Sequence, residues 1–131
     1  RDPRKLADEV LAMRQKMRDA HPNNSDSFDL KHDPGGIIDV EFIVQYLVLA
    51  HAAEYPALAD NVGNLALLKR GGELNLIAQE DADAVRDAYR AFRIQQHKVR
   101  MQGEQRARIA GEDVAGQREA VLQLWRKVFE G

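Results

Sequence analysis

The segment from Ile37 to Ala53 is apolar on nearly every side, and this feature most constrains the fold. A helix of this kind must be covered either by other elements or by lipid. The segment also contains Asp39, Glu41, Gln45 and His51, so it is too short and too polar to span a bilayer. We therefore expect a central helix with other helices packed around it.

Four further segments have the pattern of such covering helices. Asp2-Pro3 is typical of an N-cap followed by proline at the first helical position. Loops containing glycine, proline or several polar residues separate the segments. The apolar stripes consist of Leu6, Val10, Met13 and Met17; Val62, Leu65 and Leu68; Val85, Tyr89, Phe92, Gln96 and Val99; and Val121, Leu122, Trp125, Val128 and Phe129.

The five apolar segments and the residues at their ends predict the fold class and the approximate helix boundaries. Asp60 is a candidate cap for the third helix, and Gly71-Gly72 a candidate stop. The alternation of apolar and polar residues in Phe28–Lys31 indicates a short extended piece. The sequence thus predicts an all-α fold, a helical bundle of about five helices with a short extended segment near 28–31. Its large core residues are expected to be Phe42, Tyr46, Phe92 and Trp125.

Composition limits the function classes. The 131 residues suit a single helical domain, residues 1–131. The formal net charge of -2 creates no overall field that attracts nucleic acid or an anionic membrane. Cysteine is absent, which excludes disulfides and thiolate metal sites and fits a cytoplasmic location. No signal peptide is visible, and the chain begins at Arg1 without methionine, so we expect a part of a longer protein.

The stretch "FDLKHDPGGIIDVEF" places a lysine, twin glycines and two carboxylates at the start of the central helix. Asp39 and Glu41 have the spacing of a metal-binding pair on a strand, where both side chains share a face. On a helix they point about 200° apart, so we expect no shared metal ion. Asp39 lies near an apolar stripe and needs partners. These are either N–H groups of the first turn or a site lined by Lys31.

Gly35 and Gly36 precede the central helix and allow two interpretations. Free N–H groups at a helix N-terminus attract anions, and glycine permits close approach of the backbone. The alternative is a tight turn that reverses the chain after Pro34. Neither the GxGxxG nor the GK[ST] phosphate motif is present.

The long fourth helix carries a secondary basic patch of Arg93, His97 and Lys98. It is either a solvated face or a surface that meets phosphate or a partner protein. His51 and Glu54 are three residues apart, but two ligands do not make a zinc site and no HExxH is present. No Ser/His/Asp or Cys/His arrangement is recognisable, so we assign no catalytic residue and no metal site.

The stretch "FDLKHDPGGIIDVEFIVQYLVL" resembles the helical domain of the bacterial glutamine synthetase adenylyltransferase family, whose members also remove the adenylyl group. The family pattern D-[IL]-K, followed by G-G-I-x-D-[IV]-E-F, is matched by Asp29, Leu30, Lys31, Gly35, Gly36, Ile37, Asp39, Val40, Glu41 and Phe42. Phe92-Arg93 to His97 is similar to a second family pattern, LRxxxH, with phenylalanine in place of leucine. The segments "YLVLAHAAEYPAL" and "DNVGNLALLKRGGEL" resemble the C-terminal, adenylylating unit of the family more than the other unit.

This resemblance implies a C-terminal fragment of a larger multidomain enzyme with two tandem nucleotidyltransferase units, each followed by a helical domain. One unit attaches AMP from ATP, with Mg²⁺, to a tyrosine of glutamine synthetase, and the other removes it by phosphorolysis. The catalytic acids lie on a sheet that precedes the helical domain. By this resemblance the fragment alone is inactive and binds neither ATP nor Mg²⁺. The implied partners are the preceding nucleotidyltransferase domain, glutamine synthetase and the PII signal protein.

The resemblance also implies a role for the motif. Lys31, Gly35, Gly36, Asp39 and Glu41 become candidates for the surface that docks on the catalytic domain and completes its nucleotide cleft. Lys31 would neutralise phosphate charge or pair with Asp39, and the glycine N–H groups would approach the nucleotide or the neighbouring domain.

Two alternatives stay open. The first is a non-catalytic interaction module that binds glutamine synthetase or PII. The second is the helical domain of the related PII uridylyltransferase, in which HD-type phosphohydrolase motifs normally follow. None follow in this sequence.

Overall fold

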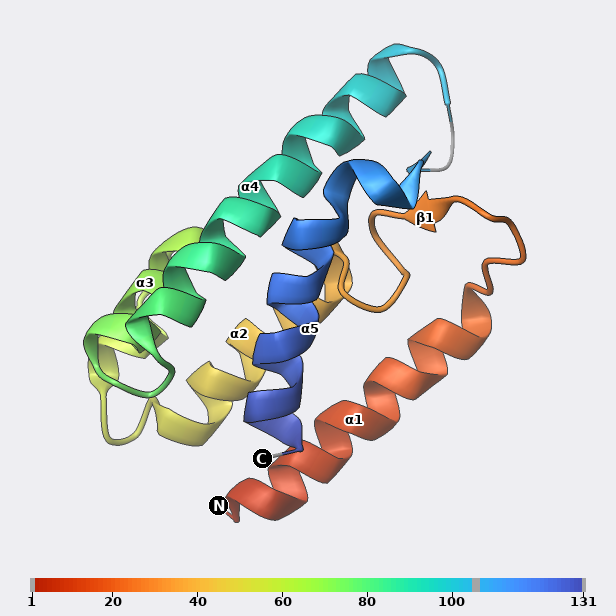
Figure 1. Ribbon diagram of the computed structural model, residues 1–131. Coiled ribbons are helices and arrows are strands. Elements are labelled where there is room, and N and C mark those ends of the chain that lie inside the picture. Colours follow the sequence, from red (N-terminus) through yellow and green to blue (C-terminus); the bar gives the residue numbers. More distant parts are fainter. Residues whose placement is uncertain (1, 105–106, 131) are drawn as a thin grey trace.

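The computed structural model describes residues 2–104 and 107–130, and its helices pack around one central helix (Figure 1). This confirms the predicted all-α bundle. The elements are α1 (Pro3–Ala20), β1 (Phe28–Asp29), α2 (Ile37–His51), the 3-10 helix η1 (Pro56–Ala59), α3 (Asn64–Glu73), α4 (Gln79–Met101), β2 (Arg108–Ile109), the 3-10 helix η2 (Gly111–Val114) and α5 (Ala115–Phe129).

Helix α2 is the centre of the bundle, as its apolar sequence predicts. It contacts each of the other four α-helices. Val40 and Ile43 on this helix are completely buried. Figure 1 shows α4 above and α1 below the pair α2 and α5, and α1 packs mainly on α2. No helix in the described part of the chain is long and apolar enough to cross a membrane.

The predicted extended segment near 28–31 is present as β1, although it has only two residues. It pairs antiparallel with β2, so that Phe28 lies opposite Ile109. The Leu30 N–H continues the contact by donating to the Ala107 carbonyl at 2.7 Å. This short ladder ties the segment after α1 to the segment after α4. Its second strand was not predicted, because the pairing joins residues far apart in the sequence.

Two residues of the predicted stripes, Met13 and Val62, are exposed, contrary to prediction. Met13 is 54% exposed, whereas its neighbour Arg14 is 1% exposed. The apolar stripe of α1 is therefore continued by a buried charge that has a partner on α2. Val62 precedes α3 and is 37% exposed.

The predicted limits of α3 are also wrong. The N-cap is Gly63, and Asp60 instead ends η1. Gly71 and Gly72 lie inside the helix. A Cβ on Gly72 would come within 2.9 Å of the Ala82 Cβ on α4. Gly72 allows α3 to approach α4 closely, and neither glycine stops the helix.

The predicted face of α4 is confirmed, because every member of its stripe is buried. The large core residues Phe42, Phe92 and Trp125 are buried as expected. Tyr46 lies at the edge of the core, where its ring packs edge-on against Phe129 with 5.2 Å between ring centroids.

Candidate functional site

Asp39 lies in the first turn of α2 and is 1% exposed. One carboxylate oxygen accepts a hydrogen bond from Arg14 Nε, and the other accepts one from the Gly35 N–H at 2.7 Å. Arg14 Nη2 also donates to the His32 carbonyl at 2.6 Å. A single buried ion pair therefore ties α1 both to the start of α2 and to the loop that carries Lys31.

These contacts decide between the alternatives for Asp39. It bonds a backbone N–H beside the first turn, as one interpretation predicts, and its ionic partner among the described residues is Arg14. The predicted pairing of Lys31 with Asp39 is wrong, because Asp39 is enclosed while the side chain of Lys31 is exposed. Arg14 was missed, although a charge four residues after Val10, within an apolar stripe, is a signal that could have revealed it.

The twin glycines form a tight turn. Gly35 has φ +84, a conformation that favours glycine, and both glycines are buried. The N–H groups from Gly35 to Ile38 all donate to acceptors between residues 30 and 39. The first N–H donors of α2 are therefore already bonded within the chain. The two glycines form the buried side of the loop.

A groove lies between the C-terminal end of α1, the start of α2 and the side of α4. It encloses about 450 Å³ and adjoins a second hollow of about 510 Å³ that reaches β2. We call the two together the basic groove. Its polar lining comprises His21, Asn24, Asp29, Lys31, His32, Glu41, Arg93, Gln96, Arg100, Glu104 and Arg108.

The basic groove carries excess positive charge, although the whole chain is slightly acidic. Lys31, Arg93 and Arg100 take part in none of the ion pairs among the described residues. Glu41 lines the wall on α2 and lies 3.4 Å from the Tyr89 hydroxyl, which donates to it. Uncompensated cations in a concave surface attract anions.

Two imidazoles border both hollows of the groove. The rings of His21 and His32 are stacked, with centroids 3.9 Å apart and planes 9° apart. Burial, followed by the neighbouring charge of His21, lowers the pKa of His32. The unfolded chain therefore binds this proton more readily. His32 consequently reduces the stability of the fold as pH falls through the ordinary histidine range.

The structure brings three of the predicted site residues together. Lys31, Glu41 and Arg93 line one groove, whereas Asp39 and the glycines lie buried behind it. Asp39 and Glu41 have different partners and do not converge on a common position.

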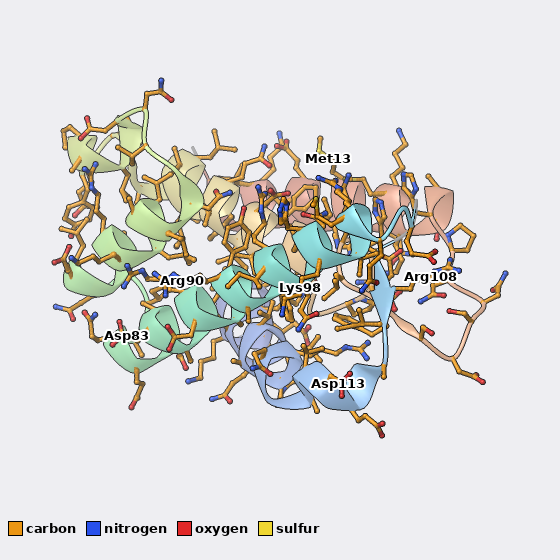
Figure 2. The ribbon with its side chains drawn as sticks, turned by 90° about the horizontal axis from the view of Figure 1, so that it is seen from above. Met13, Asp83, Arg90, Lys98, Arg108 and Asp113 are labelled. Carbon is orange, nitrogen blue, oxygen red and sulfur yellow. The ribbon has the colours of Figure 1, made fainter. Side chains whose placement is uncertain are left out.

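The other two members of the secondary basic patch, His97 and Lys98, line a separate, more apolar hollow of about 710 Å³ on the outer side of α4. Figure 2 shows Lys98 on this helix and Arg108 on the connection beyond its end. Arg93 lines both this hollow and the basic groove. Arg100 also belongs to the basic face that the sequence predicts for this helix, whereas the sequence interpretation missed Arg108 and assigned Gln96 only to the core. The spacing of Arg93, Gln96 and Arg100, which share one helix face, could have revealed this set.

Comparisons with known proteins show the family. Residues 5–125 match the family model described as GlnD PII-uridylyltransferase. The chain is similar to proteins named "bifunctional glutamine synthetase adenylyltransferase/adenylyl-removing enzyme". The identity is 53% over 129 residues for Aromatoleum aromaticum, 48% over 143 for Nitrosomonas eutropha and 47% over 129 for Burkholderia mallei.

These matches cover 98% of the chain but only 14% of the proteins from Aromatoleum and Burkholderia and 15% of that from Nitrosomonas. The resemblance stated from the motif is thereby confirmed. The chain belongs to the family of the GlnD PII-uridylyltransferase model, and nearly its whole length is similar to one segment of bifunctional glutamine synthetase adenylyltransferase/adenylyl-removing enzymes.

Proposed function

We propose that this chain is a helical domain of an enzyme that adenylylates and de-adenylylates glutamine synthetase. In this proposal the basic groove completes the nucleotide cleft of a preceding nucleotidyltransferase domain. The observation that carries it is the gathering of Lys31, Arg93 and Arg100, without acidic partners, around one groove. Transfer of a nucleotidyl group develops negative charge on phosphate oxygens, and catalysis of such transfer depends on cations placed beside them.

The local geometry explains how Lys31 is positioned. Asp29 is 7% exposed, and one of its oxygens accepts the N–H groups of Lys31 and His32, each at 2.9 Å. Arg14 holds the next carbonyl, that of His32, and the buried Asp39 holds Arg14. The backbone at Lys31 is thus fixed while its ammonium group is free to meet a phosphate.

The residues present fit the anionic part of ATP but not a magnesium site. The described residues contain no group of three or more acidic or histidine side chains that could hold a metal ion. Both oxygens of Asp39 already bond Arg14 and Gly35. We therefore assign to this chain the binding and orientation of phosphate groups. The magnesium ligands and the catalytic acids belong to the preceding domain.

The partners and the position of the domain are part of the same proposal. The named relatives act on glutamine synthetase, which supports it as the protein substrate. The sequence that follows the motif supports the C-terminal, adenylylating unit. PII is the proposed signal partner. The helical domain of a PII uridylyltransferase is the alternative, and the description of the matching family model is the observation consistent with it.

Replacing Lys31 by alanine in the full-length enzyme tests the proposal. We expect kcat/KM for adenylylation, measured at varied ATP, to fall at least about ten-fold, because a charge-assisted contact to phosphate is lost. The thermal unfolding of the domain should not change, since the side chain is exposed.

Lys16→Ala is the matched control, because it removes an exposed lysine from α1 outside the groove. Equal activity of the two variants would contradict the proposal. An effect on the KM for glutamine synthetase alone, with the KM for ATP unchanged, would contradict it as well and would favour the interaction module.

A further inference from the structure

We propose that the basic groove is a binding site for a tetrahedral dianion, such as a terminal phosphate group. The dianion binds to this chain in the absence of the neighbouring domain, and its binding is coupled to the uptake of a proton. Gln96, Arg100, Lys31 and the His21–His32 pair are its contacts. The inference rests on the phosphate-binding role proposed for the same groove, but a simple anion on the isolated chain tests it, so its outcome is independent of enzyme activity.

Gln96 is the first observation that indicates a ligand. Its side chain is only 6% exposed and lines both hollows of the groove. None of the hydrogen bonds among the described residues includes its amide. The amide is therefore open to the groove and has no partner within the described chain, so a ligand that accepts from its NH₂ group can bind it without displacing an existing hydrogen bond.

The cations around Gln96 come from three different elements. Arg100 lies one turn further along α4, Lys31 lies on the loop before α2, and Arg108 lies on β2. Arg108 Nε is buried and has no hydrogen-bond partner among the described residues. Asp29, the buried acid of the groove, accepts two backbone N–H groups with one oxygen, and it forms no ion pair with Lys31 or Arg100 among the described residues.

The stacked imidazoles add a proton-dependent charge. His32 Nδ1 is buried without a partner among the described residues, and the ring of His21 covers it. The charged groups that act on His32 include Asp29, which favours its protonation, and Lys31 and Arg14, which oppose it. The fold therefore lowers the pKa of His32 and favours its neutral form in the absence of an anion.

The remaining charged groups of the groove are Arg93 and Arg100 on α4, Arg108 on β2, and the carboxylates of Glu41 and Glu104. A bound dianion would offset the repulsion that these cations exert on a protonated imidazole. Binding would then raise the pKa of His32, and by linkage the affinity would rise as pH falls.

Sulfate is the probe, because it stays a dianion between about pH 5.5 and 8, the range in which histidine side chains commonly change charge. Sulfate is added to the 131-residue chain at constant ionic strength, and backbone amide and imidazole NMR signals are followed. We expect saturable shifts at Lys31, Gln96 and His32. We also expect an affinity roughly ten-fold higher at pH 5.5 than at pH 8. Shifts that do not saturate, or an affinity independent of pH, would overturn the inference.

Variants on α4 separate a defined site from general charge attraction. Arg100→Gln and Gln96→Leu should each weaken sulfate binding about ten-fold. Arg90→Gln, on the same helix but outside the groove, should leave it unchanged. Equal losses of sulfate affinity in Arg90→Gln and Arg100→Gln would indicate general charge attraction alone and would overturn the proposed site. Because Arg100 is exposed, this comparison holds even if the Gln96 variant does not fold.

Discussion

Replacement of Asp39 by alanine lowers the free energy of unfolding by about 3–5 kcal/mol, the range found when one partner of a buried ion pair is removed. The side chains of Asp39 and Arg14 are each 2% exposed, so the guanidinium left behind has no access to water. The variant also removes the acceptor of the Gly35 N–H. Urea denaturation followed by circular dichroism measures the loss, and it should appear as a lower midpoint with an unchanged slope.

Two further variants identify the cause of that loss. Asp87→Ala breaks the exposed pair with Arg90 and should change stability by less than about 0.5 kcal/mol. The double variant Arg14→Met with Asp39→Leu should recover part of the stability, because no charge then stays buried, although the Gly35 N–H and the His32 carbonyl still lack these partners. If Asp39→Ala were as mild as Asp87→Ala, the buried pair would not be what holds α1 to α2.

Replacement of Gly36 by alanine is expected to destabilise the fold by about 3 kcal/mol, the upper part of the range for overpacking. The φ of Gly36 is -94, so its backbone conformation suits any residue and only space is limiting. A Cβ there would lie 2.5 Å from the Leu30 carbonyl oxygen and 3.0 Å from that of Asp33. The Leu30 carbonyl cannot easily move away from this Cβ, because it accepts a hydrogen bond from the Ile37 N–H at 2.7 Å.

Gly116→Ala is the matched control for this prediction. Gly116 lies in the first turn of α5, and nothing lies within 4 Å of the Cβ that alanine would add. The control variant should be more stable than the original chain by up to about 1 kcal/mol, because alanine favours the helix. The two substitutions therefore have opposite expected signs in thermal unfolding. A neutral Gly36→Ala would show that the loop relaxes and does not need the glycine.

These two predictions concern the support beneath Lys31, whereas the Lys31 variant concerns the groove itself. Asp39 and Gly36 are buried and hold the loop of residues 29–36 against α1 and α2. In the full-length enzyme their variants should lower activity together with stability. The Lys31 variant should lower activity alone. This difference separates a positioning role from direct contact with a phosphate group.

The sequence determined the helices and the central place of α2, because helical periodicity is a local property of the chain. The stripe of α4 and the apolar circumference of α2 were sufficient to place both in the core. The divergence of Asp39 and Glu41 also followed from helix geometry alone. The motif that surrounds these two acids was specific enough to indicate the family by itself.

Only the tertiary structure decided which distant residues meet. Arg14 and Asp39 are 25 residues apart and pair because α1 crosses the start of α2. The basic groove exists because α4 brings Arg93 and Arg100 opposite the loop that carries Lys31. Likewise, Gly71 and Gly72 lie within α3 rather than at its end, and Gly72 is a close contact with α4. Such contacts depend on how the helices cross, and the spacing of residues within one helix does not specify that crossing.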